Sequence, residues 1–168
     1  MRKQLIPFFL LILFCFTQQS FASNEENFTL QQGKNISLVV EKNEEKVVHL
    51  AIDLLKRDMK SVFDAELTIG GKESHVIIGT IGQSSLLKNY AKEVNAIEGR
   101  HEAFLLKVLE GGKLLIAGSD KRGTAYGVLE LSRLLGVSPW EWWADATSEK
   151  REVFRLPVGY TLTQEPTV

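Results

Sequence analysis

A glycine-bounded turn at residues 118–127 carries the side chains best placed for chemistry, reading Gly-Ser-Asp-Lys-Arg-Gly-Thr-Ala-Tyr-Gly. It follows an apolar run of strand length and opens a helical pattern. Free backbone N–H groups at the helix start could hold an anion, with Arg122 adding a bidentate guanidinium. The same residues also suit a structural role, in which the glycines permit close packing, Ser119 or Asp120 caps the helix, and Arg122 pairs internally. The spacing fits neither the Walker phosphate loop nor the dinucleotide fingerprint, which favours the structural role, and we expect no cofactor.

A second candidate site is the aromatic cluster that follows, where all three tryptophans lie within four residues. Indole rings stack on the apolar faces of sugars, so the cluster is typical of a carbohydrate site. Packing of this loop onto a neighbouring domain explains it equally well. The candidate substrate-binding residues are Trp142, Trp143, Asp145 and Arg122. Glu141 and Asp145 form a candidate general acid/base pair, although a polar loop would carry carboxylates in any case.

Other kinds of chemistry find little support. The three histidines have no second ligand two to four positions away, so no metal site is predicted. The single cysteine, Cys15, lies in the N-terminal apolar segment, and no nucleophile-elbow serine is present. The formal net charge is −1, with basic and acidic residues interspersed. Nucleic acid and an anionic membrane surface are therefore not expected as partners.

The N-terminus, residues 1–22, has the pattern of a cleavable secretory signal peptide. Residues 2–3 are basic, residues 5–16 are apolar, and the small residues Ser20 and Ala22 predict cleavage after Ala22. A membrane anchor needs roughly 20 apolar residues, which is more than this run provides. We therefore expect an exported protein, periplasmic or secreted, with no membrane anchor.

The elements that must position the candidate residues follow from hydrophobic periodicity. A polar leader at 23–34 precedes an α/β domain at 35–150, and an extended segment at 151–168 is expected to link into a further domain. Strands are predicted at 36–40, 66–69 and 76–79, a hairpin at 103–117, and helices at 47–62, 84–91 (capped by Ser84 or Ser85) and 125–135. The last helix places Val128 and Leu129 on one face. This order predicts a mixed β-sheet with helices packed on it in a two-layer α/β fold.

Residues 116–128, with 131–132 and 136–145, closely resemble glycoside hydrolase family 115. These enzymes are xylan α-glucuronidases, which remove glucuronic acid or its 4-O-methyl form from xylan. The closing residues 165–168 resemble the lead-in to the catalytic (β/α)8 barrel of that family. The shorter pattern within 118–127 is also similar to the non-catalytic N-terminal α/β domain of β-hexosaminidases and other α-glucuronidases.

The resemblance implies a fold like the β-hexosaminidase N-terminal domain, without a catalytic barrel in this chain. It implies the non-catalytic N-terminal part of an exported α-glucuronidase, with its own barrel as partner and glucuronoxylan as substrate. The acid and base of a single-displacement hydrolysis would lie on barrel strands, so no catalytic residue is assigned here. A stand-alone carbohydrate-binding or interaction module that uses its tryptophans directly is the alternative.

Overall fold

The structure is a computed structural model that describes residues 27–70, 74–138, 140 and 147–166. Its strands are β1 (Phe28–Gln31), β2 (Ile36–Val39), β3 (Leu67–Ile69), β4 (Val76–Thr80), β5 (Phe104–Val108), β6 (Leu114–Gly118), β7 (Val153–Leu156) and β8 (Thr161–Gln164). Its helices are α1 (Lys46–Phe63), α2 (Ala91–Val94) and α3 (Lys121–Leu134), with the short 3-10 helices η1 (Ser85–Tyr90) and η2 (Asn95–Ile97) on either side of α2.

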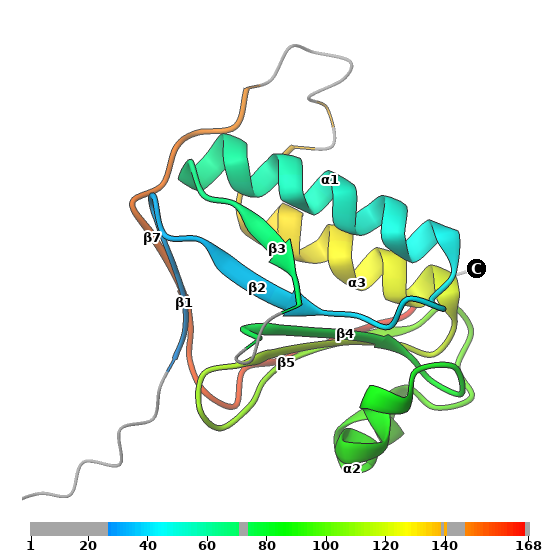
Figure 1. The fold of residues 1–168 in the computed structure, drawn as a ribbon. Coiled ribbons are helices and arrows are strands. Elements are labelled where there is room, and N and C mark those ends of the chain that lie inside the picture. The colour runs from blue at the N-terminus through cyan, green and yellow to red at the C-terminus, as the bar shows by residue number, and fades with distance from the viewer. Residues whose placement is uncertain (1–26, 71–73, 139, 141–146, 167–168) are drawn as a thin grey trace, which may run out of the picture.

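Six strands form one open mixed sheet in the order β3-β2-β4-β6-β5-β8. β2 pairs in parallel with β3 and β4, and β4 pairs in parallel with β6. β5 is antiparallel to β6 and to β8, which confirms the predicted hairpin. α1 and α3 lie side by side over one face of this sheet (Figure 1). The predicted fold class, an α/β mixed sheet with helices packed on it, is confirmed, and the described strands close no barrel.

The two long helices form because their apolar side chains recur every three or four residues and face the sheet. In α1, Val48, Ile52 and Leu55 are buried at this spacing. In α3, Val128 is fully buried, but Leu129 is 39% exposed. The prediction that Leu129 shares the buried face is therefore wrong, because a step of one residue turns the helix by about 100°.

The opposite face of the sheet is partly covered by η1, α2 and η2. Leu87, Val94 and Ile97 from these short helices pack against Leu105 and Leu115 of the sheet. This second apolar cluster explains why a segment with weak helical periodicity is ordered, since burial of its apolar side chains offsets the loss of chain entropy.

The expected helix cap at Ser84 or Ser85 is wrong. Ser84 precedes η1 without making a capping hydrogen bond. The N–H of Ser85 donates to Glu41 at 2.8 Å, and its hydroxyl donates to the other oxygen of the same carboxylate. A charged acceptor binds a hydroxyl more strongly than a neutral one does, so the serine pairs with Glu41. Hydrogen bonding to Ser85 holds the pKa of Glu41 below its ordinary value.

A two-stranded ribbon of β1 and β7 joins the two ends of the domain. Phe28 pairs with Leu156 and Leu30 pairs with Phe154 in antiparallel register. Phe28 and Leu30 are almost completely buried in the main core. The stretches expected as a polar leader (23–34) and as an extended linker (151–168) thus contribute β1, β7 and β8 to the fold.

None of the described helices is both long and apolar enough to cross a membrane. The predicted signal peptide, residues 1–22, lies outside the described residues.

Candidate functional site

The turn between β6 and α3 is held by one carboxylate, that of Asp120. Its Oδ1 accepts hydrogen bonds from the N–H groups of Arg122 and Gly123, both at 2.9 Å. Its Oδ2 accepts a third from the N–H of Glu102 at 2.8 Å. Burial opposes ionisation of this group, but the three main-chain hydrogen bonds together hold the pKa of Asp120 below its ordinary value. The protein's own carboxylate therefore occupies the position where an external anion could have bound, and the predicted cap at Asp120 is confirmed.

The glycines of this turn allow α3 to approach the sheet closely. A Cβ atom at Gly118 would lie 2.0 Å from the backbone nitrogen of Thr124, and one at Gly123 would lie 2.2 Å from the carbonyl oxygen of Ala103. At Gly127 it would press on side chains of β5 and β6. These distances are too short for any non-bonded contact, so the glycine pattern serves packing.

Arg122 forms an ion pair inside the domain. Its Nη1 donates to Oε1 of Glu102 at 2.7 Å, and this hydrogen bond raises the pKa of Arg122. The arginine side chain is largely exposed, while the carboxylate of Glu102 is mostly buried. Glu102 also has a left-handed backbone, with φ of 52°. The internal pairing predicted for Arg122 is therefore confirmed, with Glu102 as the partner.

The aromatic cluster is represented in the structure only by Trp140. Trp142, Trp143 and Asp145, together with Glu141, lie outside the described residues. The Trp140 side chain is 65% exposed, and its N–H donates to the hydroxyl of Ser138 at 3.2 Å. Trp140 follows the C-terminal end of α3, whereas Arg122 lies in the first turn of that helix.

A buried polar network behind the turn was missed by the sequence reasoning. The Glu44 carboxylate accepts hydrogen bonds from the N–H and the hydroxyl of Thr80, at 2.9 and 2.8 Å. The hydroxyls of Thr80 and Thr124 lie 2.7 Å apart. Glu44 thereby ties the segment before α1 to the end of β4 and, through Thr80, to the start of α3, which fixes the two helices relative to the sheet.

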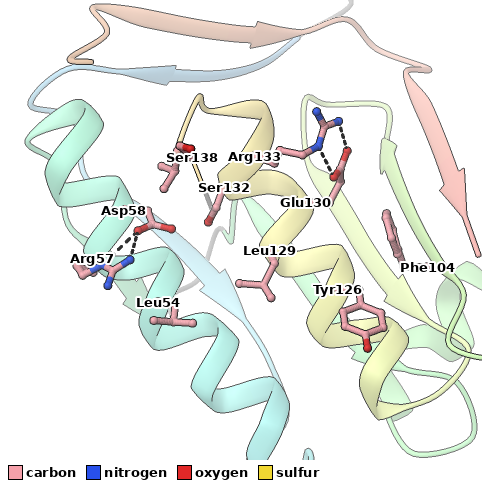
Figure 2. Close-up of a pocket in the computed structure, with 11 residues that line it drawn as sticks. Leu54, Arg57, Asp58, Phe104, Tyr126, Leu129, Glu130, Ser132, Arg133 and Ser138 are labelled. Atoms are coloured by element: carbon pink, nitrogen blue, oxygen red, sulfur yellow. Dashed lines mark hydrogen bonds and ion pairs between the residues drawn. The ribbon is translucent and has the colours of Figure 1, made fainter. Parts of the chain in front are cut away.

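A hollow of about 350 Å³ extends over α3, from α1 on one side to β5 on the other. We call it the α3 groove; its lining includes Leu54, Phe104, Tyr126, Leu129, Ser132 and Ser138. Figure 2 shows Leu54 and Leu129 between the two helices, with Tyr126 on the side of α3 nearer Phe104.

Two arginine–carboxylate pairs border the α3 groove. Arg57 Nη2 lies 3.0 Å from Asp58 Oδ1, and Arg133 binds both oxygens of Glu130 at 2.6 and 2.5 Å. Both carboxylates are buried and both arginines are partly exposed. Each charge is compensated by its partner, so the groove presents an apolar lining with paired charges at its border.

No group of three potential metal ligands occurs among the residues that the structure describes.

The family model described as the glycosyl hydrolase family 67 N-terminus matches residues 21–131, the segment that contains β1 to β6 and most of α3. The chain belongs to this family of N-terminal domains. No curated protein sequence matches it.

The solved structure of one enzyme resembles this N-terminal domain in both sequence and fold. It is a family GH115 4-O-methyl-α-glucuronidase with specificity for decorated arabinogalactans. The sequence identity is 48% and the TM-score is 0.80, over 84% of this chain and 19% of that one. The resemblance to family 115 is therefore confirmed. The chain spans about a fifth of the length of this relative.

Two β-hexosaminidases share the fold at much lower identity. The enzyme of Streptomyces plicatus is 13% identical with a TM-score of 0.52, over 84% of this chain and 23% of that one. The enzyme of Streptomyces coelicolor A3(2) is 13% identical with a TM-score of 0.53, over 84% and 24%. The predicted likeness to the N-terminal domain of β-hexosaminidases is confirmed at the level of fold.

The α3 groove was also missed from the sequence, although a signal for it was present. Tyr126, Leu129 and Arg133, which line the groove, follow one another at steps of three and four residues. This spacing describes a second stripe on α3, separate from the buried one.

Proposed function

We propose that the chain is the non-catalytic N-terminal domain of an exported α-glucuronidase that releases glucuronic acid, or its 4-O-methyl form, from a decorated polysaccharide. The observation that carries this proposal is the 48% identity over 84% of the chain to a 4-O-methyl-α-glucuronidase. Sequence identity at this level, over most of the chain, supports the same role as an N-terminal domain in the same kind of enzyme.

The chemistry of the described residues supports a non-catalytic role. Glycoside hydrolysis with inversion uses two carboxyl groups roughly 6.5–9.5 Å apart that face one open site. The buried carboxylates of Asp58, Glu44, Glu102 and Glu130 are each bound to a donor of this domain. None of these four described carboxylates is thus free to act as the acid or the base. The resemblance implies that the acid and base lie on a (β/α)8 barrel in another part of the enzyme.

Two polysaccharides are candidate substrates of the complete enzyme. The sequence motif resembles xylan α-glucuronidases, which favours glucuronoxylan. The solved relative is described as specific for decorated arabinogalactans, which adds that class. Both carry the same uronic acid chemistry, and the described residues of this domain offer no unpaired arginine near the motif that would select between them.

The test begins with the coding sequence downstream of Val168 and with expression of the complete protein beside the 168-residue chain. We expect the complete protein to release glucuronic acid from glucuronoxylan or arabinogalactan, and the 168-residue chain to release none. The N-terminus of the exported protein, read by mass spectrometry, should be Ser23. A downstream sequence without a hydrolase, together with polysaccharide binding by the chain alone, would instead show a stand-alone carbohydrate-binding module.

A further inference from the structure

A wide hollow lies on the side of the sheet that the short helices cover. It has a volume of about 1060 Å³ and is bounded by η1 and α2, by β5, and by the β5–β6 and β7–β8 turns. We call it the short-helix groove. Figure 1 shows α2 on the side of the sheet away from α1 and α3. The short-helix groove is therefore separate from the α3 groove, and it shares no lining residue with it.

Two lysines of the β5–β6 hairpin line this groove on the same face of the sheet. Lys107 is paired in register with Leu115, and Lys113 precedes Leu115 by two positions on the other strand. Residues in this diagonal relation lie about 7–8 Å apart in an antiparallel pair. Neither ammonium group forms an ion pair or a hydrogen bond with another described residue. Because like charges at this spacing repel, an anion bound between them would be stabilising.

The position of Lys107 within the sheet is unusual for a lysine. Side chains at every second position of a strand share a face, so Lys107 lies on the same face as Leu105 and Leu109. Both leucines belong to the second apolar cluster. Lys107 is only partly exposed, and a partly buried charge without a partner is unfavourable. An apolar side chain would suit this packing better, so the charge favours a binding role over a structural one.

The rest of the lining suits a sugar chain. Tyr90 packs against the second apolar cluster and also lines the groove, so its ring is held where a sugar ring can stack. Asn89, Glu93 and Glu110 add an amide and two carboxylates, which can bind sugar hydroxyls. The same carboxylates would repel a polyanion such as nucleic acid. The lining thus favours a mostly neutral chain that carries occasional acidic groups.

We propose that the short-helix groove binds a polysaccharide that carries uronic acid groups. A uronate carboxylate lies between Lys107 and Lys113, and a neighbouring sugar ring stacks on Tyr90. The inference goes beyond the proposed function, because it assigns to this domain a binding site apart from the site of hydrolysis. The choice of glucuronoxylan as the ligand to be tested rests on the proposed function.

Affinity electrophoresis of the chain that starts at Ser23 tests this site with two forms of one polymer. The first gel contains glucuronoxylan, and the second contains the same glucuronoxylan after chemical reduction of its carboxyl groups to primary alcohols. We expect the apparent Kd to be at least about fivefold higher for the reduced polymer, because two charge pairs are lost. Equal Kd values for the two polymers, or no retardation by either, would overturn the proposal.

Substitutions then place the binding in the groove. Lys107→Gln combined with Lys113→Gln should raise the Kd for glucuronoxylan at least about fivefold, whereas arginine at both positions should retain binding. Tyr90→Ala should weaken binding of both polymers, since stacking does not depend on the carboxylate. Lys92→Gln is the matched control, because Lys92 is exposed on α2 and does not line the groove.

Circular dichroism melts establish that each variant is folded. The comparison of the two polymers needs no substitution, so it decides the question even where a variant unfolds. An unchanged Kd in the folded double glutamine variant would overturn the proposal. An equal loss of binding in Lys92→Gln would overturn it as well, because it would show a general effect of positive charge.

Kinetics of the complete protein separate this inference from the proposed function. The double glutamine variant should raise the KM for polymeric glucuronoxylan and leave unchanged the KM for xylotriose carrying one glucuronic acid, which is too short to occupy both sites. An unchanged KM for the polymer would count against the groove alone. If the complete protein releases no glucuronic acid, the proposed function fails, while the electrophoresis still decides whether the groove binds uronic acids.

Discussion

Replacing Asp120 by asparagine tests the interpretation of the glycine-bounded turn most directly. Asparagine keeps one carbonyl oxygen for the N–H groups of Arg122 and Gly123, but its amide NH2 would face the N–H of Glu102. The substitution therefore removes a charge-assisted cap and leaves a donor unpaired. Asparagine is about as good an N-cap residue as aspartate, so most of the loss comes from the unpaired N–H of Glu102, and an unpaired buried donor costs about 1–3 kcal/mol. We expect the free energy of unfolding to fall by about 1–3 kcal/mol at pH 7.

The effect of Asp120→Asn should depend on pH in a defined direction. The pKa of Asp120 in the folded domain lies below its ordinary value, so the carboxylate stabilises the fold above about pH 4. As the pH falls through the folded-state pKa, protonation removes this contribution from the wild-type chain. The difference between wild type and variant should therefore shrink on acidification.

Urea unfolding of both proteins, followed by circular dichroism between pH 7 and pH 2.5, measures this difference. Asp53→Asn is the control, because Asp53 is an exposed partner of Lys56 and a surface ion pair contributes only about 0–1 kcal/mol. A variant as stable as wild type at pH 7, or a stability difference that stays constant with pH, would refute the capping role.

Three further predictions use the same unfolding assay or enzyme kinetics. Gly123→Ala should destabilise the domain by more than about 2 kcal/mol, since the new Cβ would lie 2.2 Å from the carbonyl oxygen of Ala103. Unchanged stability would show that α3 can shift away from this carbonyl group. Leu115→Ala should lower the free energy of unfolding by about 2–5 kcal/mol, because the Leu115 side chain is fully buried. Leu129→Ala in the 168-residue chain should lower it by less than about 1 kcal/mol, because Leu129 is partly exposed. A larger loss for Leu129→Ala than for Leu115→Ala would contradict the described core. Arg122→Lys in the complete enzyme should weaken the ion pair with Glu102, with a small loss of stability and an unchanged KM. A raised KM for uronic acid substrates at unchanged stability would instead place Arg122 in a substrate site.

The sequence by itself determined the parts of the fold that depend on local periodicity. The spacing of apolar residues predicted α1 and α3, and the Gly111–Gly112 turn between two apolar runs predicted the β5–β6 hairpin. The motif at 118–127 predicted a capped helix start, and residues 116–128 with 131–132 and 136–145 indicated the family by resemblance. These features are local because helix and hairpin contacts join residues close in sequence.

Only the tertiary structure decided which distant segments meet. β2 lies between β3 and β4, and β1 pairs with β7 across most of the chain, because strand neighbours are selected by burial of whole faces. The same is true of side chains: Arg122 pairs with Glu102, Glu44 reaches Thr80, and Leu129 lies on the outer face of α3. A periodic pattern gives the direction of a side chain around its own helix or strand. The group that it meets depends on how helices and strands far apart in the sequence pack together.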